Sequence, residues 1–455
     1  MNGRPIPGFY WDPEKKKYFR VQANHVAPAG SQYSREAVKR RKLDNERQVA
    51  IDRRVRRERM RRSRCMDYAF SRLGHEIGKN SFRGFARKSQ QGKVYVSQLQ
   101  RHSLCSLGYS NVFDFARHGP SGALVAATCM PRSTHMMLLP PASNSKSADM
   151  WEYDIEQIAS QSFVQYELSS MSMCDSRYFV ATYLNGIFGD SVVKLSRIPD
   201  PDSTSSEEFW NNSVNSSDSI RSLEITFWCS EARPNSSSNP IFAVGTSEGL
   251  QTIHVGNFSS DSKSVLNRPK DVLAVEWLNP TVIASGFRDS LLFLSDLRSN
   301  DSVQRIKHPG MIGQIKKIDD HQFVVAGTRS LQTYDLRFAK NEVKTGSKRR
   351  RRGGSTSSTR PYLVFDNYNR ENYHSMDINK ELGLLATTTE DRQNIRFYSL
   401  ADGAIVPSPT LLRDTYNDRT FINKIRFEEY QYPMHQRQAP RLLYAQGPDI
   451  VELAW

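Results

Sequence analysis

A strand pattern that recurs seven times is the feature that most restricts how this chain can fold. Each copy contains an alternating strand, a polar turn, an apolar run that ends in a small residue or threonine, and a further apolar strand. The apolar runs are residues 124–128, 178–182, 241–245, 282–286, 323–328, 384–387 and 442–445. Ala284 and Ala326, in successive copies, lie 42 residues apart, close to the length of a four-stranded propeller blade. The sequence therefore predicts an all-β fold, a seven-bladed β-propeller over residues 107–455.

Polar insertions separate the more widely spaced copies, as expected of surface loops between blades. The alternative of two unrelated β-sandwiches would not explain a repeat that persists to the C-terminus. Three segments are predicted ahead of the propeller: a small aromatic hairpin at residues 1–33, a basic helix at 34–64 and a connecting segment at 65–106. Within the propeller, residues 341–361 are predicted to form a disordered basic insertion.

The predicted hairpin has aromatic residues on both sides of an Asp-Pro-Glu-Lys turn at residues 12–15. Asp followed by Pro is favoured at the first two positions of a type I turn. Aromatic side chains outside a propeller would be costly to expose, so we expect them to cover either this protein's own surface or a partner.

The net charge of the chain is +15, from 63 Lys and Arg against 48 Asp and Glu, and it is confined to two short segments. Residues 35–64 carry a net +9 and residues 348–352 carry +5, which leaves 44 basic and 43 acidic residues elsewhere. The rest of the protein is therefore nearly neutral. The two basic segments predict nuclear localisation or a docking role rather than a DNA-binding fold.

Residues 34–64 contain no Gly or Pro and are rich in helix-forming residues. Ser34 is predicted to cap this helix, with Glu36 in the first turn, where the helix dipole favours an anion. Its sparse apolar residues form no wide stripe, so we do not expect it to pack along its length on a domain core. A solvated helix, a nucleic-acid arm and a partner-docking helix all remain open.

The second basic segment is a candidate nuclear-localisation signal in a flexible loop rich in Gly, Ser and Thr. An idle disordered loop is the alternative. The candidate residues are Lys348, Arg349, Arg350, Arg351 and Arg352.

The sequence predicts no enzyme. Residues 245–249 match the G-x-S-x-G pattern around Ser247, but a nucleophile elbow needs a helix after the serine, and residues 250–255 are predicted to form a strand. A hairpin turn between two blade strands explains the pattern better. The ten histidines show no metal-ligand spacing, and we expect neither a metal nor a cofactor.

The five cysteines form no C-x-x-C pair, which argues against a disulfide framework and a zinc cluster. No apolar run approaches the length of a membrane helix, and residues 1–5 show no apolar signal segment. We therefore expect a soluble intracellular protein with no membrane partner.

Two successive copies of the repeat end in Asp-Leu-Arg, at Asp296 to Arg298 and at Asp335 to Arg337. We expect each tripeptide at the end of the third strand of its blade, with Asp bonded to turn amides and Arg at the rim of one face. Paired guanidinium groups suit carboxylates or backbone carbonyls of a partner. The alternative is that both copies merely reflect the consensus of the repeat.

Taken together, these features resemble the WD-repeat substrate receptors of the cullin-4 RING ubiquitin ligase. The resemblance rests on the motif Pro-Gly-Phe-Tyr…Asp-Pro-Glu-Lys…Tyr-Phe-Arg at residues 7–20, the basic helix, Arg-Lys-Ser-Gln at residues 87–90 and the propeller with paired Asp-x-Arg motifs. It covers nearly the whole chain; the opening motif is specific, whereas the propeller pattern is generic. Ser295 and Tyr334 stand where strands of the family end in Trp, and the fifth copy lacks the turn Asp that Asp289 supplies in the fourth.

The resemblance implies that Asp296, Arg298, Asp335 and Arg337 bind the DNA-damage-binding adaptor that links such receptors to cullin-4. It also implies that the basic helix can help to dock the receptor. The expected function is a non-enzymatic receptor that presents a protein substrate for ubiquitination, in the nucleus and with the cytoplasm as a second compartment. The alternative is a nuclear WD-repeat scaffold that binds nucleic acid or chromatin through the basic helix, with strongly salt-dependent affinity.

Overall fold

The computed structural model describes two compact units, residues 1–83 and 84–455, which are treated separately below. In the first unit it describes residues 9–12, 17–21, 34 and 36–40. In the second it describes residues 84–454 except for the following positions: 109–110, 120, 131–132, 142–152, 154–158, 165, 185, 187–188, 199–218, 235–239, 257–259, 300–301, 329, 339–358, 366–367, 369–374, 409–410, 412–419 and 429–439.

The second unit contains seven antiparallel sheets of four strands each, which confirms the predicted seven-bladed β-propeller. The first three sheets consist of β4 (Asn111–Arg117), β5 (Leu124–Met130), β6 (Ser133–Leu139) and β7 (Ala159–Val164); β8 (Glu167–Met173), β9 (Tyr178–Leu184), β10 (Ser191–Arg197) and β11 (Ser219–Ser222); and β12 (Phe227–Ala232), β13 (Ile241–Thr246), β14 (Gly249–Val255) and β15 (Ser260–Asn267).

The other four sheets follow in chain order. They consist of β16 (Val272–Asn279), β17 (Val282–Phe287), β18 (Leu291–Asp296) and β19 (Ser302–Lys307); β20 (Ile312–Lys317), β21 (Gln322–Gly327), β22 (Ser330–Asp335) and β23 (Leu363–Val364); β24 (Met376–Asn379), β25 (Leu384–Thr388), β26 (Ile395–Ser399) and β27 (Ile405–Val406); and β28 (Ile422–Glu428), β29 (Arg441–Gln446), β30 (Asp449–Ala454) and β3 (Gln100–Ser106).

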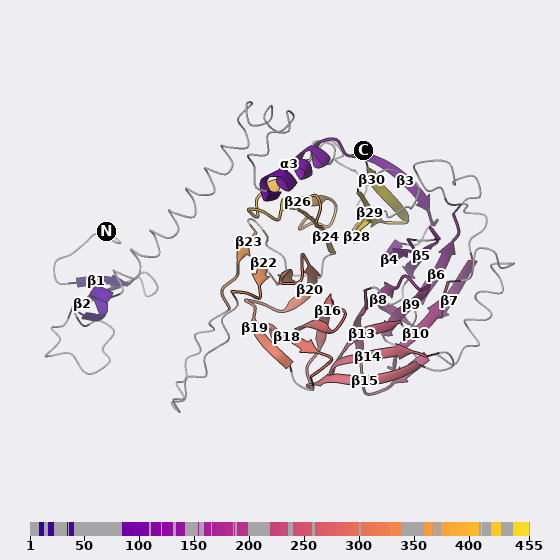
Figure 1. Ribbon diagram of the computed structural model, residues 1–455, viewed down its shortest axis with the longest axis horizontal. Helices are drawn as coiled ribbons and strands as arrows, with labels where there is room; N and C mark the ends of the chain where they lie inside the picture. The colour runs from indigo at the N-terminus through magenta and orange to yellow at the C-terminus, as the bar shows by residue number, and fades with distance from the viewer. Residues whose placement is uncertain are drawn as a thin grey trace. The chain divides into compact units, whose positions relative to one another are not determined.

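The sheets are arranged around a common centre, and the innermost strands are β4, β8, β12, β16, β20, β24 and β28 (Figure 1). Adjacent inner strands contact one another around the ring, as β4 does with β8 and with β28. The second strands are almost wholly buried, because sheets pack against both of their faces; in β13 all six residues are buried. All seven predicted apolar runs coincide with these second strands.

The ring is closed by β3, which pairs with β30 and completes the last sheet. The predicted boundary at residue 107 is therefore wrong by one strand, since the segment assigned as a connection (65–106) contributes residues 100–106 to the propeller. The physical reason is that the partner of β3 lies about 350 residues away in sequence, where no local pattern reveals the pairing.

The predicted connecting segment also contains a helix, α3 (Gly84–Ser97), which precedes β3 and packs beside β26 (Figure 1). Tyr95, Val96 and Leu99 are buried in the core between the last two sheets, with Phe397 and Leu453. A side chain at Gly92 would meet the Leu382 carbonyl oxygen, so the helix approaches the sheet closely at that point. The arrangement anchors the start of the propeller to its end.

In the first unit, β1 (Phe9–Asp12) and β2 (Lys17–Arg20) form the predicted hairpin, with Tyr10 opposite Phe19. Residues 36–40 are helical, and the Ser34 hydroxyl accepts a hydrogen bond from the Ala37 amide at 3.3 Å, which confirms the predicted cap. Residues 41–64 of the predicted basic helix and the basic residues 348–352 lie outside the described residues.

Candidate protein-interaction surface

The two Asp-Leu-Arg motifs form the same structure at the ends of β18 and β22, the third strands of adjacent sheets. In the first motif, Asp296 Oδ1 accepts hydrogen bonds from the Arg298 amide and Nε, both at 3.0 Å, and Arg298 Nη2 donates to Asp296 Oδ2 at 2.7 Å. In the second, the Arg337 amide and Nε donate to Asp335 Oδ1 at 3.0 Å, and Nη2 donates to Oδ2 at 2.6 Å. Each aspartate therefore holds its arginine in a bidentate fork and caps the turn.

Electrostatics keeps both forks charged. Hydrogen bonds from the Arg298 side chain and amide lower the pKa of Asp296 to about 2, and those from Arg337 and Gln322 lower the pKa of Asp335 to about 2. The arginine side chains remain 73% and 54% exposed for Arg298 and Arg337, respectively. Two guanidinium groups of fixed orientation are thus presented to solvent, although an exposed ion pair contributes little to folding.

Both arginines lie on one face of the propeller. Successive strands of a blade run in opposite directions, so the turns after all the third strands lie at the same end of the sheets. Beside Arg337 the surface is aromatic: the Phe338 side chain is 70% exposed with the guanidinium 5.8 Å from its ring centre, and Tyr362 is 58% exposed. Exposed aromatic groups beside an ordered arginine have the composition of a binding hot spot.

The residues that replace the strand-ending Trp behave differently in the two blades. Tyr334 is buried, its hydroxyl donates to Gln332 Oε1 at 2.8 Å, and it accepts from His308 Nδ1 at 2.9 Å. The other ring nitrogen of His308 accepts from the Ser330 hydroxyl at 2.6 Å, so the neutral imidazole is satisfied on both sides. Ser295 is buried as well, but its hydroxyl has no hydrogen-bond partner among the described residues.

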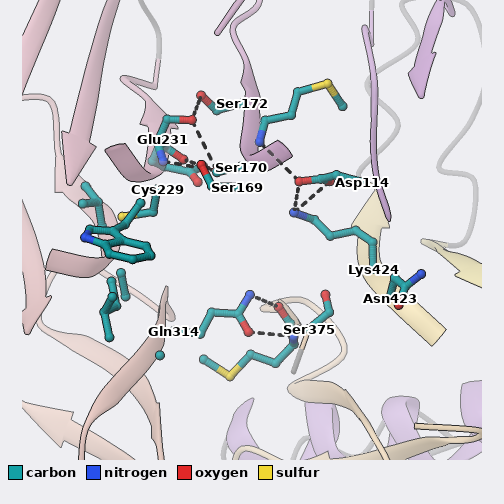
Figure 2. Close-up of a pocket in the computed structure, with 18 of the residues that line it drawn as sticks. Asp114, Ser169, Ser170, Ser172, Cys229, Glu231, Gln314, Ser375, Asn423 and Lys424 are labelled. Atoms are coloured by element: carbon teal, nitrogen blue, oxygen red, sulfur yellow. Dashed lines mark hydrogen bonds and ion pairs between the residues drawn. The ribbon is translucent and has the colours of Figure 1, made fainter. Parts of the chain in front are cut away.

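A second candidate site, which sequence reasoning missed, is a cavity of about 630 Å³ along the propeller axis. All seven inner strands line it, and their polar side chains also join neighbouring blades (Figure 2). Asp114 on β4 pairs with Lys424 on β28 at 2.9 Å and accepts from the Met171 amide on β8 at 3.3 Å. Gln314 on β20 exchanges two hydrogen bonds with the backbone of Met376.

Lys316, in the cavity lining, and the neighbouring Glu276 compensate each other's charge. Burial raises the pKa of Glu276 to about 7, opposed by Lys316, whose ammonium lies 3.7 Å away. Burial also opposes the charge on Lys316, but Glu231, Glu276 and Asp377 outweigh it and raise its pKa. Lys316 is therefore charged at neutral pH, held by three surrounding carboxyl groups. No single run of sequence signals this set, because its members come from different blades.

Ser247 lies in the turn between β13 and β14, and its hydroxyl accepts a hydrogen bond from the Thr226 amide at 3.1 Å. A strand, not a helix, follows it, as predicted from the sequence. Among the described residues, no three His, Cys, Asp or Glu side chains are grouped to bind a metal ion. None of the helices in that part of the chain is long and apolar enough to span a membrane.

Comparison with known proteins supports the fold. No protein-family model matches the sequence. The chain is 24% identical over 367 residues to WD repeat-containing protein 21 of Schizosaccharomyces pombe, covering 76% of this chain and 80% of that protein. It also resembles the β-propeller domain of Cps50 (Swd1) from Myceliophteria thermophila, with a TM-score of 0.51 and 10% identity, over 78% of this chain and 100% of that one. The chain therefore has the seven-bladed propeller fold of WD-repeat proteins.

Proposed function

We propose that this WD-repeat propeller is a non-enzymatic substrate receptor of a cullin-4 RING ubiquitin ligase in the nucleus. Arg298 and Arg337 bind the DNA-damage-binding adaptor, and another surface holds the protein substrate. The observation that carries the proposal is the pair of identical Asp–Arg forks at the ends of adjacent third strands.

The forks fit a partner surface for a physical reason. A guanidinium held by its own carboxylate keeps its orientation before binding, so little side-chain entropy is lost when a partner arrives. In each fork, Nε and Nη2 are used internally, which leaves the other terminal nitrogen for an acceptor on the partner. Phe338 and Tyr362 add exposed apolar area beside one of the two arginines.

The test is a pull-down of the full chain with the adaptor. We expect the double variant Arg298→Ala/Arg337→Ala to recover at least about tenfold less adaptor than the unchanged chain, because an arginine at a binding hot spot contributes about 2 kcal/mol or more. The conservative pair Arg298→Lys/Arg337→Lys should lose most of the binding too, since lysine cannot form the fork.

The matched control is Arg288→Ala. Arg288 is also half exposed and paired with an aspartate, Asp271, but it lies in the turn between β17 and β18, at the opposite end of the sheet from Arg298. This variant should recover the adaptor fully. Undiminished recovery by the Arg298→Ala/Arg337→Ala variant would refute the proposed contact.

A further inference from the structure

One arginine at the mouth of the axial cavity has a backbone conformation that arginine rarely adopts. Arg392, in the turn between β25 and β26, has φ of 59°, in the left-handed region that disfavours side chains with a Cβ. The corresponding residue of the next blade is Gly447, also with φ of 59°. The two positions are equivalent, since the Arg392 carbonyl accepts from the Ile422 amide and the Gly447 carbonyl accepts from the Val112 amide, each at the start of the following inner strand. A glycine at residue 392 would adopt this φ angle without strain. The fold alone therefore does not explain why the residue is an arginine.

No carboxylate among the described residues forms an ion pair with Arg392. Its side chain makes one hydrogen bond, from Nη2 to Asn423 Oδ1 at 2.7 Å, and its Nε has no partner among the described residues. Asp391 is on the same turn, but its carboxylate accepts from the Thr389 hydroxyl and the Gln393 amide instead. Burial lowers the pKa of Arg392, as expected for a partly desolvated cation.

Three of the four other cations that line the cavity are neutralised, and the fourth, Arg426, lies within the inner strand β28 rather than in a turn at the mouth. Lys424 pairs with Asp114, and Lys316 lies among carboxyl groups. Arg288, at the same end of the propeller as Arg392, pairs with Asp271 at 2.9 Å. Arg392 is therefore a positive charge in a turn at the entrance of a cavity of about 630 Å³, without a carboxylate partner among the described residues.

Aromatic surface surrounds this charge. The Phe421 side chain is 51% exposed, with the Arg392 guanidinium 5.3 Å from its ring centre. Asn423, which accepts a hydrogen bond from Arg392, donates one to the Val112 carbonyl at 2.8 Å. Phe113, the next residue after Val112, is 38% exposed and lines the cavity. The mouth therefore places the Arg392 guanidinium against the exposed ring of Phe421, and the Phe113 ring lines the same cavity.

We propose that this mouth binds an acidic segment of a protein, with an Asp or Glu carboxylate on Arg392 and apolar atoms against Phe421 and Phe113. A carboxylate matches the site better than a phosphate, because the Arg392 guanidinium balances one negative charge, and Lys424 and Arg288 are already paired. The backbone strain at Arg392 fits this role, since such strain is retained where a ligand needs the side chain.

The site lies at the end of the propeller opposite the Asp-Leu-Arg forks, because it follows a second strand and they follow third strands. A bound segment would therefore leave Arg298 and Arg337 free. The inference does not rest on adaptor binding, and the two are measured separately.

The test uses the purified full chain and oriented libraries of blocked decapeptides that carry one fixed residue: Glu, Gln, Lys or phosphoserine. We expect retention of the Glu library at least about fivefold above the Gln library, and loss of this preference in Arg392→Gly. Arg305→Gln, which removes one positive charge from the exposed outer strand β19, should keep the preference and serves as the control for net charge. Because glycine accepts a φ of 59°, Arg392→Gly should melt at the same temperature as the unchanged chain or up to about 2 °C higher.

Four outcomes would overturn the proposal. Equal retention of the Glu and Gln libraries would show that the mouth does not select an acidic residue. An unchanged preference in Arg392→Gly would show that Arg392 does not bind the carboxylate. A preference for phosphoserine over Glu would replace the carboxylate by a phosphate. A melting temperature lowered by more than about 3 °C in Arg392→Gly would assign the side chain a structural role.

Discussion

Two buried tyrosines at the same position of adjacent blades should respond in opposite ways to the same substitution. Tyr334 on β22 and Tyr398 on β26 are each at most 1% exposed, and each is the penultimate residue of its third strand. The Tyr334 hydroxyl joins Gln332 to His308, whereas the Tyr398 hydroxyl has no hydrogen-bond partner among the described residues. Replacement of either tyrosine by phenylalanine removes one oxygen atom and preserves the packing of the ring.

The expected magnitudes follow from what each change leaves behind. Tyr334→Phe leaves the His308 Nδ1 hydrogen and the Gln332 amide oxygen without this hydrogen-bond partner, in residues that are 1% and 9% exposed. A buried polar group left without its partner costs about 1–3 kcal/mol, so we expect Tyr334→Phe to lower the free energy of unfolding by about 3 kcal/mol. Tyr398→Phe removes a desolvated hydroxyl that has nothing to bond, so the change should be neutral or stabilising by up to about 1 kcal/mol.

The assay is urea denaturation followed by tryptophan fluorescence, with the slope of the transition compared between variants to confirm that the same surface unfolds. Tyr334→Phe should shift the midpoint downward and Tyr398→Phe should leave it in place or raise it. Equal destabilisation by the two substitutions would refute the reasoning, because hydrogen bonding by the Tyr334 hydroxyl would then contribute nothing beyond packing.

Two further predictions concern titration. Burial lowers the pKa of His308 to about 4 in the folded chain, against about 6.5 when unfolded, so the unfolded state binds more protons and stability falls as pH drops from 6.5 towards 4. We expect a loss of about 2 kcal/mol at pH 5 relative to pH 7.5, measured by urea denaturation, and His308→Gln should abolish that part of the pH dependence. Burial also raises the pKa of Cys105 and of Cys229 to about 12, so neither thiol should react with iodoacetamide at pH 8 until urea unfolds the chain; rapid alkylation of the native protein would contradict the burial of these thiols.

Much of the propeller could be predicted because its second strands carry a local signal. Residues buried between two neighbouring sheets are mostly apolar. Small residues are needed where blades approach closely, as at Gly245, where a Cβ would meet the Val272 carbonyl oxygen. The Asp-Leu-Arg motifs were equally visible, since the aspartate and arginine that form each fork are two residues apart. Their role in binding an adaptor stays a prediction.

The missed features depend on contacts between distant parts of the chain. The strand β3 (Gln100–Ser106) has an unremarkable sequence, and only its pairing with β30 makes it a strand of the last blade. The helix α3 has no acidic residue in its first turn and contains Gly92, so neither capping nor propensity indicates it. The significance of Arg392 depends on its φ angle and on the lack of an ion-pair partner among the described residues, neither of which can be read from the turn sequence.

The pairing of β3 with β30 also determines when the last blade can form during translation. A ribosome produces β3 early, and its partner emerges only after more than 340 further residues have been translated. Until then β3 offers an unpaired edge on a nascent chain whose other blades are already able to fold. A frameshift or premature stop codon after β29 would remove β30, so β3 could not pair and the propeller could not close. We expect cellular quality control to recognise such products, although six of their seven sheets are complete.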